Sequence, residues 1–254
     1  MLLAIDVGNT HTVVGVHDGA DWIAMWRRST DADDTEDQIG VWLRGLFDLS
    51  GLPWKVDSAI CASVVPALDP ALDKMCERWL NVRLRFLRRG DQVGLKVSYE
   101  PPTAVGADRL ANALGALVKY RPPIIVVDFG TATTFDAIDS EGTYAGGAIL
   151  PGVHVSSQAL FGRAAKLPAV EFKAPEKAIG KTTVQSLQSG IMLGYAGAID
   201  ALAARIGAEL GEARVIATGG LGSLFLGLCE SLEEYEPTLT LDGLLVAHER
   251  LSGN

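Results

Sequence analysis

The sequence is short of cysteine, histidine and aromatic side chains. It has 254 residues, of which three are cysteine, four are histidine and 7% are aromatic. The cysteines Cys61, Cys76 and Cys229 are far apart and include no Cys-x-x-Cys pair, and the histidines form no ligand pattern. We therefore expect no structural zinc site. Scattered free thiols are typical of a reducing compartment, so we expect a cytoplasmic protein.

Basic charge and long apolar runs are also scarce. Lys and Arg number 22 against 31 Asp and Glu, which gives a net charge of −9. We therefore expect no nonspecific binding to nucleic acid or to an anionic membrane, although a local ATP site is not excluded. The N-terminus lacks a basic segment and Asp6 interrupts its apolar run, so we expect no signal peptide. No run approaches the roughly 18 uncharged apolar residues of a membrane span.

A strand–turn–strand pattern occurs twice in the chain. Apolar residues 124–127 precede Asp128-Phe129-Gly130-Thr131-Ala132-Thr133-Thr134, and residues 2–5 precede Asp6-Val7-Gly8-Asn9-Thr10-His11-Thr12. The two copies align without a gap, so that Thr12 matches Thr134. An acid at a strand end can hold a cation, and turn amides and hydroxyls can contact phosphate oxygens. Two copies predict a duplicated domain with a ligand between the halves, although ordinary hairpin turns also use Asp and Gly.

The order of the expected elements is typical of an α/β protein. In the first half, a Thr35–Gln38 capping box begins a helix. The other elements expected there are strands at 2–5, 12–16, 22–28, 58–65 and 82–87 and helices at 69–80 and from 106. Pro122-Pro123 ends the last of these helices, and we expect domains at 1–121 and 122–254. The second half is expected to contain strands at 124–127, 135–138, 146–152 and 214–218. The helices expected there are at 153–160, 182–210, 239–251 and from Gly222 to near Ser231, with an irregular segment at 161–181.

Several polar residues allow both a structural and a functional interpretation. Asp108 suits the first turn of a helix, but beside Arg109 it could accept a hydroxyl proton while the guanidinium holds a substrate carboxylate. Thr183 could be the N-cap of the long helix. Tyr99 could belong to a core, and His11 could face phosphate or solvent. Gly180-Lys181-Thr182 is not a P-loop, because Pro175 stands where the upstream glycine should be.

Taken together, the motifs resemble those of type III pantothenate kinases over nearly the whole chain. They occur in the family's order, and they are Asp6-Val7-Gly8-Asn9-Thr10, Gly106-Ala107-Asp108-Arg109, Asp128–Thr134, Gly146-Gly147-Ala148-Ile149-Leu150-Pro151-Gly152 and Thr218-Gly219-Gly220. The resemblance implies two ribonuclease H-like (actin-like ATPase) domains, an active site in the cleft between them, and a homodimer. It also implies phosphorylation of pantothenate by ATP, the first step of coenzyme A biosynthesis.

The same resemblance assigns roles to individual residues. The catalytic base falls on Asp108, and the ligand of a monovalent cation, K⁺ or NH₄⁺, falls on Asp128. Mg²⁺ is expected near Asp6. ATP contacts fall on Asp6, Val7, Gly8, Asn9, Thr10, His11, Thr12, Val13 and Thr131. Pantothenate contacts fall on Tyr99, Gly106, Ala107, Asp108, Arg109 and Thr183, the last reaching in from the neighbouring subunit.

Three alternatives to this function stay open at the level of sequence. A kinase of the same architecture could act on another small hydroxy acid. A nucleotide-sensing regulator is disfavoured by the acidic charge and by the intact acid and base residues. A chaperone-like ATPase is disfavoured because the chain has no separate peptide-binding domain.

Overall fold

The chain folds into two compact units in a computed structural model that describes residues 1–164 and 166–253. Unit 1 comprises Met1–Gly115 and the C-terminal segment from Leu239, and unit 2 comprises Ala116–Thr238. The expected division at 121/122 differs from this. The chain passes into unit 2 within helix α3 (Ala107–Lys119), and helix α7 (Leu239–Ser252) belongs to unit 1 rather than to the second half.

Close packing explains why α7 lies in unit 1. A Cβ at Gly243 would stand 1.7 Å from the carbonyl oxygen of Ala111, so α7 touches the backbone of α3. A Cβ at Gly15 would stand 2.8 Å from the Leu241 side chain. The buried leucines of α7 therefore find their partners in unit 1, although they follow unit 2 along the chain.

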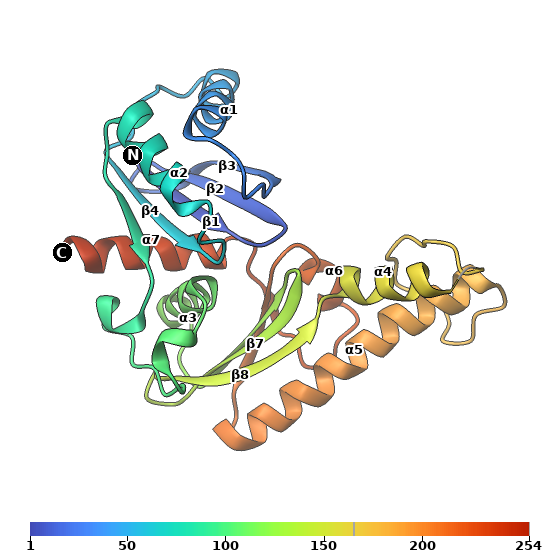
Figure 1. The fold of residues 1–254 in the computed structure, drawn as a ribbon. Coiled ribbons are helices and arrows are strands. Elements are labelled where there is room, and N and C mark those ends of the chain that lie inside the picture. Colours follow the sequence, from blue (N-terminus) through green and yellow to red (C-terminus); the bar gives the residue numbers. More distant parts are fainter. Residues whose placement is uncertain (165, 254) are drawn as a thin grey trace. The chain divides into compact units, whose positions relative to one another are not determined.

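Unit 1 is a five-stranded mixed sheet with helices on its faces (Figure 1). The strand order is β3-β2-β1-β4-β5; β2 is antiparallel to β1 and β3, and β4 is parallel to β1 and β5. The strands are β1 (Leu2–Val7), β2 (His11–His17), β3 (Trp22–Ser29), β4 (Ser58–Ser63) and β5 (Leu84–Leu87). Besides α3 and α7, the helical segments are α1 (Glu36–Leu49), α2 (Asp69–Met75), the π-helical turn η1 (Cys76–Leu80) and the 3₁₀ turns η2 (Gly90–Val93) and η3 (Pro102–Ala104).

Side-chain alternation along β1 divides the two faces of this sheet. Leu3, Ile5 and Val7 are buried in one core cluster with residues of α1 and α2. Alternate residues of a strand point to opposite faces, so Asp6 points to the other face. The expected capping box of α1 is confirmed, since the Gln38 amide donates to Thr35 Oγ1 and Gln38 Oε1 accepts from the Thr35 amide.

Unit 2 repeats the topology of unit 1. Its strand order is β10-β9-β6-β7-β8, with β6, β7 and β8 antiparallel in turn and β9 and β10 parallel to β6. The strands are β6 (Ile124–Phe129), β7 (Ala132–Ile138), β8 (Tyr144–Pro151), β9 (Arg214–Thr218) and β10 (Glu234–Tyr235), and the helices are α4 (Val153–Arg163), α5 (Thr183–Leu210) and α6 (Gly222–Leu226). The duplication expected from the sequence is thus confirmed as two ribonuclease H-like sheets.

Helix α5 lies along the unit 2 sheet with α4 beside its N-terminal half (Figure 1). Met192, Ala196, Ile199 and Ala203 of α5 pack in the unit 2 core. By length and composition alone α5 could cross a membrane, and only 22% of its most apolar window is buried. A single such helix is weak evidence for a span, because one side of α5 packs on the sheet.

Two other expected elements end earlier in the structure. The strand expected at 58–65 ends at Ser63, and the helix expected to reach Ser231 ends at Leu226. Asp200 of α5 accepts hydrogen bonds from the amides of Glu230 and Ser231 instead, at 3.1 and 2.9 Å. The segment after α6 is therefore an ordered turn whose amides are satisfied from α5.

Candidate active site

The first loop of interest is the three-residue turn Gly8-Asn9-Thr10 between β1 and β2. It is closed by the Gly8 amide, which donates to the His11 carbonyl at 3.0 Å. Asn9, Thr10 and His11 are exposed. The side chains of Val7 and Thr12 are buried, so they support the loop from beneath rather than presenting groups to a ligand.

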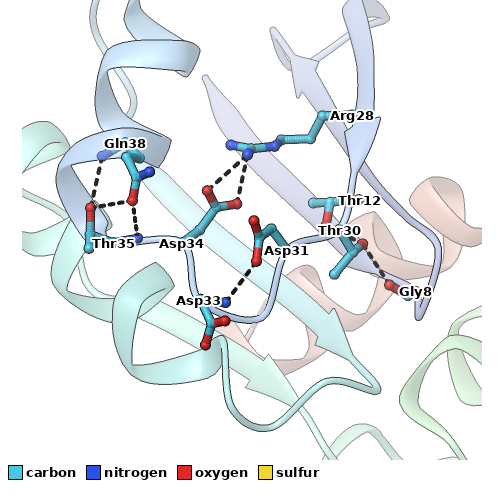
Figure 2. A network of polar contacts seen from close by, with 9 residues as sticks. All are labelled: Gly8, Thr12, Arg28, Thr30, Asp31, Asp33, Asp34, Thr35 and Gln38. Carbon is cyan, nitrogen blue, oxygen red and sulfur yellow. Dashed lines mark hydrogen bonds and ion pairs between the residues drawn. The ribbon is translucent and has the colours of Figure 1, made fainter.

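A residue outside the expected site holds this loop from the side. Thr30 follows β3, and its amide donates to the Thr10 carbonyl at 2.9 Å. Its hydroxyl donates to the Gly8 carbonyl at 2.7 Å and lies 2.9 Å from the Thr12 hydroxyl (Figure 2). The sequence analysis assigned no role to Thr30. The available signal was a threonine placed directly after the third strand.

The corresponding loop of unit 2, Gly130-Thr131, is one residue shorter. The Gly130 amide donates to the Ala132 carbonyl at 3.1 Å. In the sheets Asp6 pairs with Val13, whereas Asp128 pairs with Thr134. The ungapped alignment of the two copies is therefore wrong beyond the glycine, and Thr12 corresponds to Thr133 rather than to Thr134.

The unit 2 loop is held by Gly152 and by α5. The Gly152 amide donates to the Thr131 carbonyl at 3.0 Å, and a Cβ at Gly152 would stand 2.3 Å from that oxygen. Only glycine fits this approach. The Tyr195 hydroxyl donates to the Pro151 carbonyl and lies 3.1 Å from Thr133 Oγ1. Gly152 is also the N-cap of α4, so the helix begins beside the loop.

Asp128 stands at the end of β6 beside a glycine turn. Gly219 has a φ of +83°, and a Cβ there would lie 2.4 Å from Asp128 Oδ1. The Tyr235 hydroxyl donates to the Gly219 carbonyl at 3.1 Å. Burial, and then the Asp128 charge, raise the pKa of Tyr235. A carboxylate in a cradle that admits no side chain offers oxygen ligands suited to a hard cation.

The Gly106-Ala107-Asp108-Arg109 segment lies at the same edge of unit 1 as the first loop. The Val64 amide donates to the Val7 carbonyl at 3.0 Å, and a Cβ at Gly106 would stand 3.7 Å from Val64. That Cβ would also lie 2.5 Å from Asp108 Oδ1. Glycine at 106 therefore lets the carboxylate fold back over the start of α3.

The Asp108 carboxyl is desolvated at this position. Burial raises the pKa of Asp108, and the Arg109 amide, which donates to Asp108 Oδ1 at 2.8 Å, together with the Arg109 charge, lowers it less. Arg109 is itself 7% exposed. A carboxylate with a raised pKa is a better proton acceptor than an ordinary Asp.

Comparison with known proteins decides the family. The model of the type III pantothenate kinase family matches residues 2–205. The chain is 48% identical over 252 residues to the type III pantothenate kinase of Anaeromyxobacter sp. (strain Fw109-5), covering 98% of this chain and 99% of that protein. Identity to the Myxococcus xanthus enzyme is 46%, covering 98% of each. The chain belongs to the type III pantothenate kinase family.

Two solved structures with low identity support the fold. A Sinorhizobium meliloti protein assigned as a 2-dehydro-3-deoxygalactonokinase has a TM-score of 0.59 at 13% identity, with 98% of this chain and 96% of that chain covered. MreB 5 of Spiroplasma citri has a TM-score of 0.54 at 11% identity, with 100% and 97% covered. Both agree with the fold expected from the family resemblance.

The remaining residues expected from the family fall in both units. Tyr99 is half-buried and lies between η2 and η3 along the chain. It belongs to unit 1, as do the first loop and Asp108. Asp128, Thr131 and Thr183 belong to unit 2. Thr183 is the exposed first residue of α5; the N-cap is Thr182, whose Oγ1 accepts from the Gln185 amide at 3.2 Å. The N-cap interpretation of Thr183 is therefore wrong by one residue.

The carboxylates expected to bind metal ions do not belong to a cluster of metal-ligating side chains. Among residues 1–164 and 166–253, no three His, Cys, Asp or Glu side chains gather as a metal site. Asp6 and Asp128 each offer one carboxylate at a strand end. Such single carboxylates suit a cation that takes its other ligands from phosphate oxygens and water, as Mg²⁺ does with nucleotides.

Proposed function

We propose that this chain transfers the γ-phosphoryl group of ATP to the 4′-hydroxyl of pantothenate, the first step of coenzyme A biosynthesis. The support is membership of the type III pantothenate kinase family over residues 2–205. The observation that carries the chemistry is the desolvated Asp108 carboxyl at the start of α3.

Asp108 is the proposed general base. In the reaction the 4′-oxygen forms a bond to the γ-phosphorus, the bond from that phosphorus to the bridging oxygen of ADP breaks, and the hydroxyl proton passes to the Asp108 carboxylate. Its raised pKa favours accepting that proton. The Arg109 amide bonded to Asp108 Oδ1 fixes the carboxylate, which leaves the other oxygen to meet the hydroxyl.

ATP is proposed to contact two loops. In unit 1 these contacts come from Asp6, Gly8, Asn9, Thr10, His11 and Val13, with Val7 and Thr12 acting beneath the loop. In unit 2 the contact comes from Thr131, which is exposed and held by Gly152. Amides and hydroxyls in such turns suit phosphate oxygens. Mg²⁺ near Asp6 neutralises phosphate charge when bound.

Asp128 is the proposed ligand of a monovalent cation, K⁺ or NH₄⁺. The observation that supports this assignment is the close approach of Asp128 to Gly219, since the Asp128 carboxylate occupies the space that a Cβ at residue 219 would need. Such a cation offsets negative charge on the phosphates. The Asp128 carboxylate orients it from the end of β6.

Pantothenate is proposed to be held by Tyr99, Gly106, Ala107 and Asp108, with Arg109 on its carboxylate and Thr183 supplied by a second copy of the chain. A homodimer accounts for an exposed Thr183 at the start of α5 and for the exposed Gly190, Gly194 and Gly197 along that helix. Small residues let another helix approach closely. The buried free thiols agree with a cytoplasmic enzyme.

The test is ADP release by the purified protein with Mg-ATP, with and without pantothenate, in Na⁺ and then in K⁺ or NH₄⁺. We expect pantothenate-dependent turnover in K⁺ or NH₄⁺ only. Turnover with another hydroxy acid but not with pantothenate would point to a different kinase. ATP binding without any turnover would point to a nucleotide-sensing regulator.

A further inference from the structure

We propose that Thr30 is a positioning residue that sets the conformation of the first phosphate loop and thereby the affinity for ATP. The inference rests on the proposed function in one respect, namely that this loop binds the phosphates of ATP. Thr30 is not expected to touch the nucleotide. It acts through Gly8, Thr10 and Thr12, all three of which it contacts.

The contacts form a directed chain of hydrogen bonds. The Thr30 hydroxyl gives its proton to the Gly8 carbonyl at 2.7 Å, so the Thr12 hydroxyl, 2.9 Å away, must donate to Thr30 Oγ1. The Thr30 amide extends the β2–β3 ladder by one bond, to Thr10. Both ends of the Gly8-Asn9-Thr10 turn are therefore bound to one residue.

The direction of the Gly8 carbonyl has a consequence for anion binding. A carbonyl oxygen facing a phosphate would repel it, whereas amides facing it attract. The hydrogen bond from the Thr30 hydroxyl keeps the Gly8 carbonyl oxygen pointing toward Thr30. Without that donor the peptide is free to rotate, and each ATP binding event must then order the loop at an entropic cost.

The segment that contains Thr30 is anchored by an ion pair between Arg28 and Asp34. Arg28 Nη2 lies 2.7 Å from Asp34 Oδ2 and 2.9 Å from Oδ1, and the Asp34 side chain is only 6% exposed. The Arg28 guanidinium also stacks on Trp42 of α1, 5.2 Å from the ring centroid. The segment from β3 to α1 is thus fixed on both sides of Thr30.

Unit 2 uses the same position for the same purpose. Ser29 pairs with His11 and Pro151 with Ala132, so Thr30 and Gly152 both directly follow the third strand of their sheet. Gly152 also donates its amide to its loop, to the Thr131 carbonyl at 3.0 Å. In unit 1 the Thr30 hydroxyl fixes the loop, and in unit 2 the close packing of Gly152 against the Thr131 carbonyl fixes it. The two residues therefore share the role of holding the loop beside them.

The experiment compares Thr30→Val, Thr30→Ser and Thr35→Val with the wild-type protein. Thr35→Val is the matched control: it lies five residues along the same segment, and it removes the N-cap hydroxyl of α1 but none of the Thr30 contacts. The readouts are the melting temperature, the Kd for a non-hydrolysable Mg-ATP analogue and the kinetic constants with pantothenate.

We expect Thr30→Val to raise the analogue Kd and the KM for ATP about tenfold, with kcat and the KM for pantothenate changed less than about threefold. Thr30→Ser should restore wild-type binding. Thr35→Val should lower the melting temperature without weakening analogue binding. A Thr30→Val protein that binds the analogue as the wild type does overturns the proposal, and so does equal weakening by Thr35→Val.

The analogue Kd separates this inference from the proposed function. A wild-type protein that binds the analogue but does not phosphorylate pantothenate would defeat the function and leave the Thr30 comparison intact. A wild-type protein that binds no nucleotide defeats both. Pantothenate turnover with an unaltered Kd in Thr30→Val defeats the Thr30 proposal alone.

Discussion

The carboxylate of Asp128 lies against the backbone of Gly219, so closely that a Cβ at Gly219 would stand 2.4 Å from Oδ1 and 2.7 Å from the Phe129 nitrogen. Gly219 has a φ of +83°, a conformation that costs other residues roughly 1–2 kcal/mol. Glycine is therefore needed here twice, for its backbone angle and for the space that the Asp128 carboxylate occupies.

A first prediction is that Gly219→Ala removes activation by K⁺. The added methyl group displaces the Asp128 carboxylate, so turnover should lose its dependence on K⁺ and fall about tenfold or more at saturating K⁺. The measurement is kcat as a function of K⁺ concentration at constant ionic strength. Asp128→Ala should show the same flat response.

The control for that variant is Gly227→Ala. Gly227 ends α6 with a φ of −90°, and no described atom lies within 4 Å of a Cβ placed there. Its K⁺ response should match that of the wild type. Normal K⁺ activation in Gly219→Ala would place the cation elsewhere.

A second prediction separates catalysis from stability at Asp108. Asp108→Asn keeps an oxygen to accept the Arg109 amide but cannot accept a proton, so kcat should fall about 10²- to 10⁴-fold while the Kd for ATP stays within about twofold. The wild-type rate should fall as the pH drops through the raised pKa of Asp108, above the 3.8 of an ordinary Asp. Near-normal kcat in Asp108→Asn would remove the base assignment.

The same variant should be more stable than the wild type at neutral pH. Because burial raises the pKa of Asp108 in the folded state, the ionised form weakens folding, and this penalty is absent below the unfolded value of 3.8 and complete above the folded pKa. The melting temperature gained by Asp108→Asn should therefore grow as the pH rises from about 4 to about 8. A gain that is constant with pH would mean that ionisation is not its cause.

Local patterns in the sequence predicted most elements of the fold and supplied the residues proposed for the site. Both hairpins, the acids at their strand ends and the capping box at Thr35 were predictable because neighbouring residues alone determine them. The register of the second hairpin was not, since turns of two and three residues both keep the Asp-x-Gly spacing. Only the pairing of Asp128 with Thr134 distinguishes them.

Long-range contacts were out of reach of such patterns. Thr30 acts on Gly8 across 22 residues, and a threonine in a polar segment gives no sign of that partner. Helix α7 follows β10 along the chain, yet Gly243 packs on Ala111 of α3. Tertiary packing decides to which unit such a helix belongs, and a single sequence does not reveal which residues it packs against.

A third prediction concerns the thiols. Cys61, Cys76 and Cys229 are buried and free. Burial raises the pKa of Cys76 to about 12 and that of Cys229 to about 12, and it raises the pKa of Cys61 well above its usual range. Because the thiolate is the reactive form, iodoacetamide at about pH 8 should leave the native protein unmodified and label all three thiols after unfolding. Mass spectrometry counts the additions, and rapid labelling of the native protein would contradict the burial.

A fourth prediction tests the proposed dimer through α5. Gly194 is exposed, and no described atom lies within 4 Å of a Cβ placed there. Gly194→Lys should not weaken the helix itself, because Lys is a better helix former than Gly by roughly 0.5–1 kcal/mol. A charge on the apolar face of α5 should nevertheless prevent a second helix from packing there, and light scattering should then report a monomer.

The dimer variant also tests the shared substrate site. If Thr183 of one copy serves the site of the other, the monomeric Gly194→Lys protein should lose pantothenate turnover about 10²-fold while it still binds an ATP analogue. Gly207→Lys, on the same helix and equally open at its Cβ, serves as the control for added charge. A fully active monomer would show that each chain has a complete site and would end the assignment of Thr183 to the neighbouring subunit.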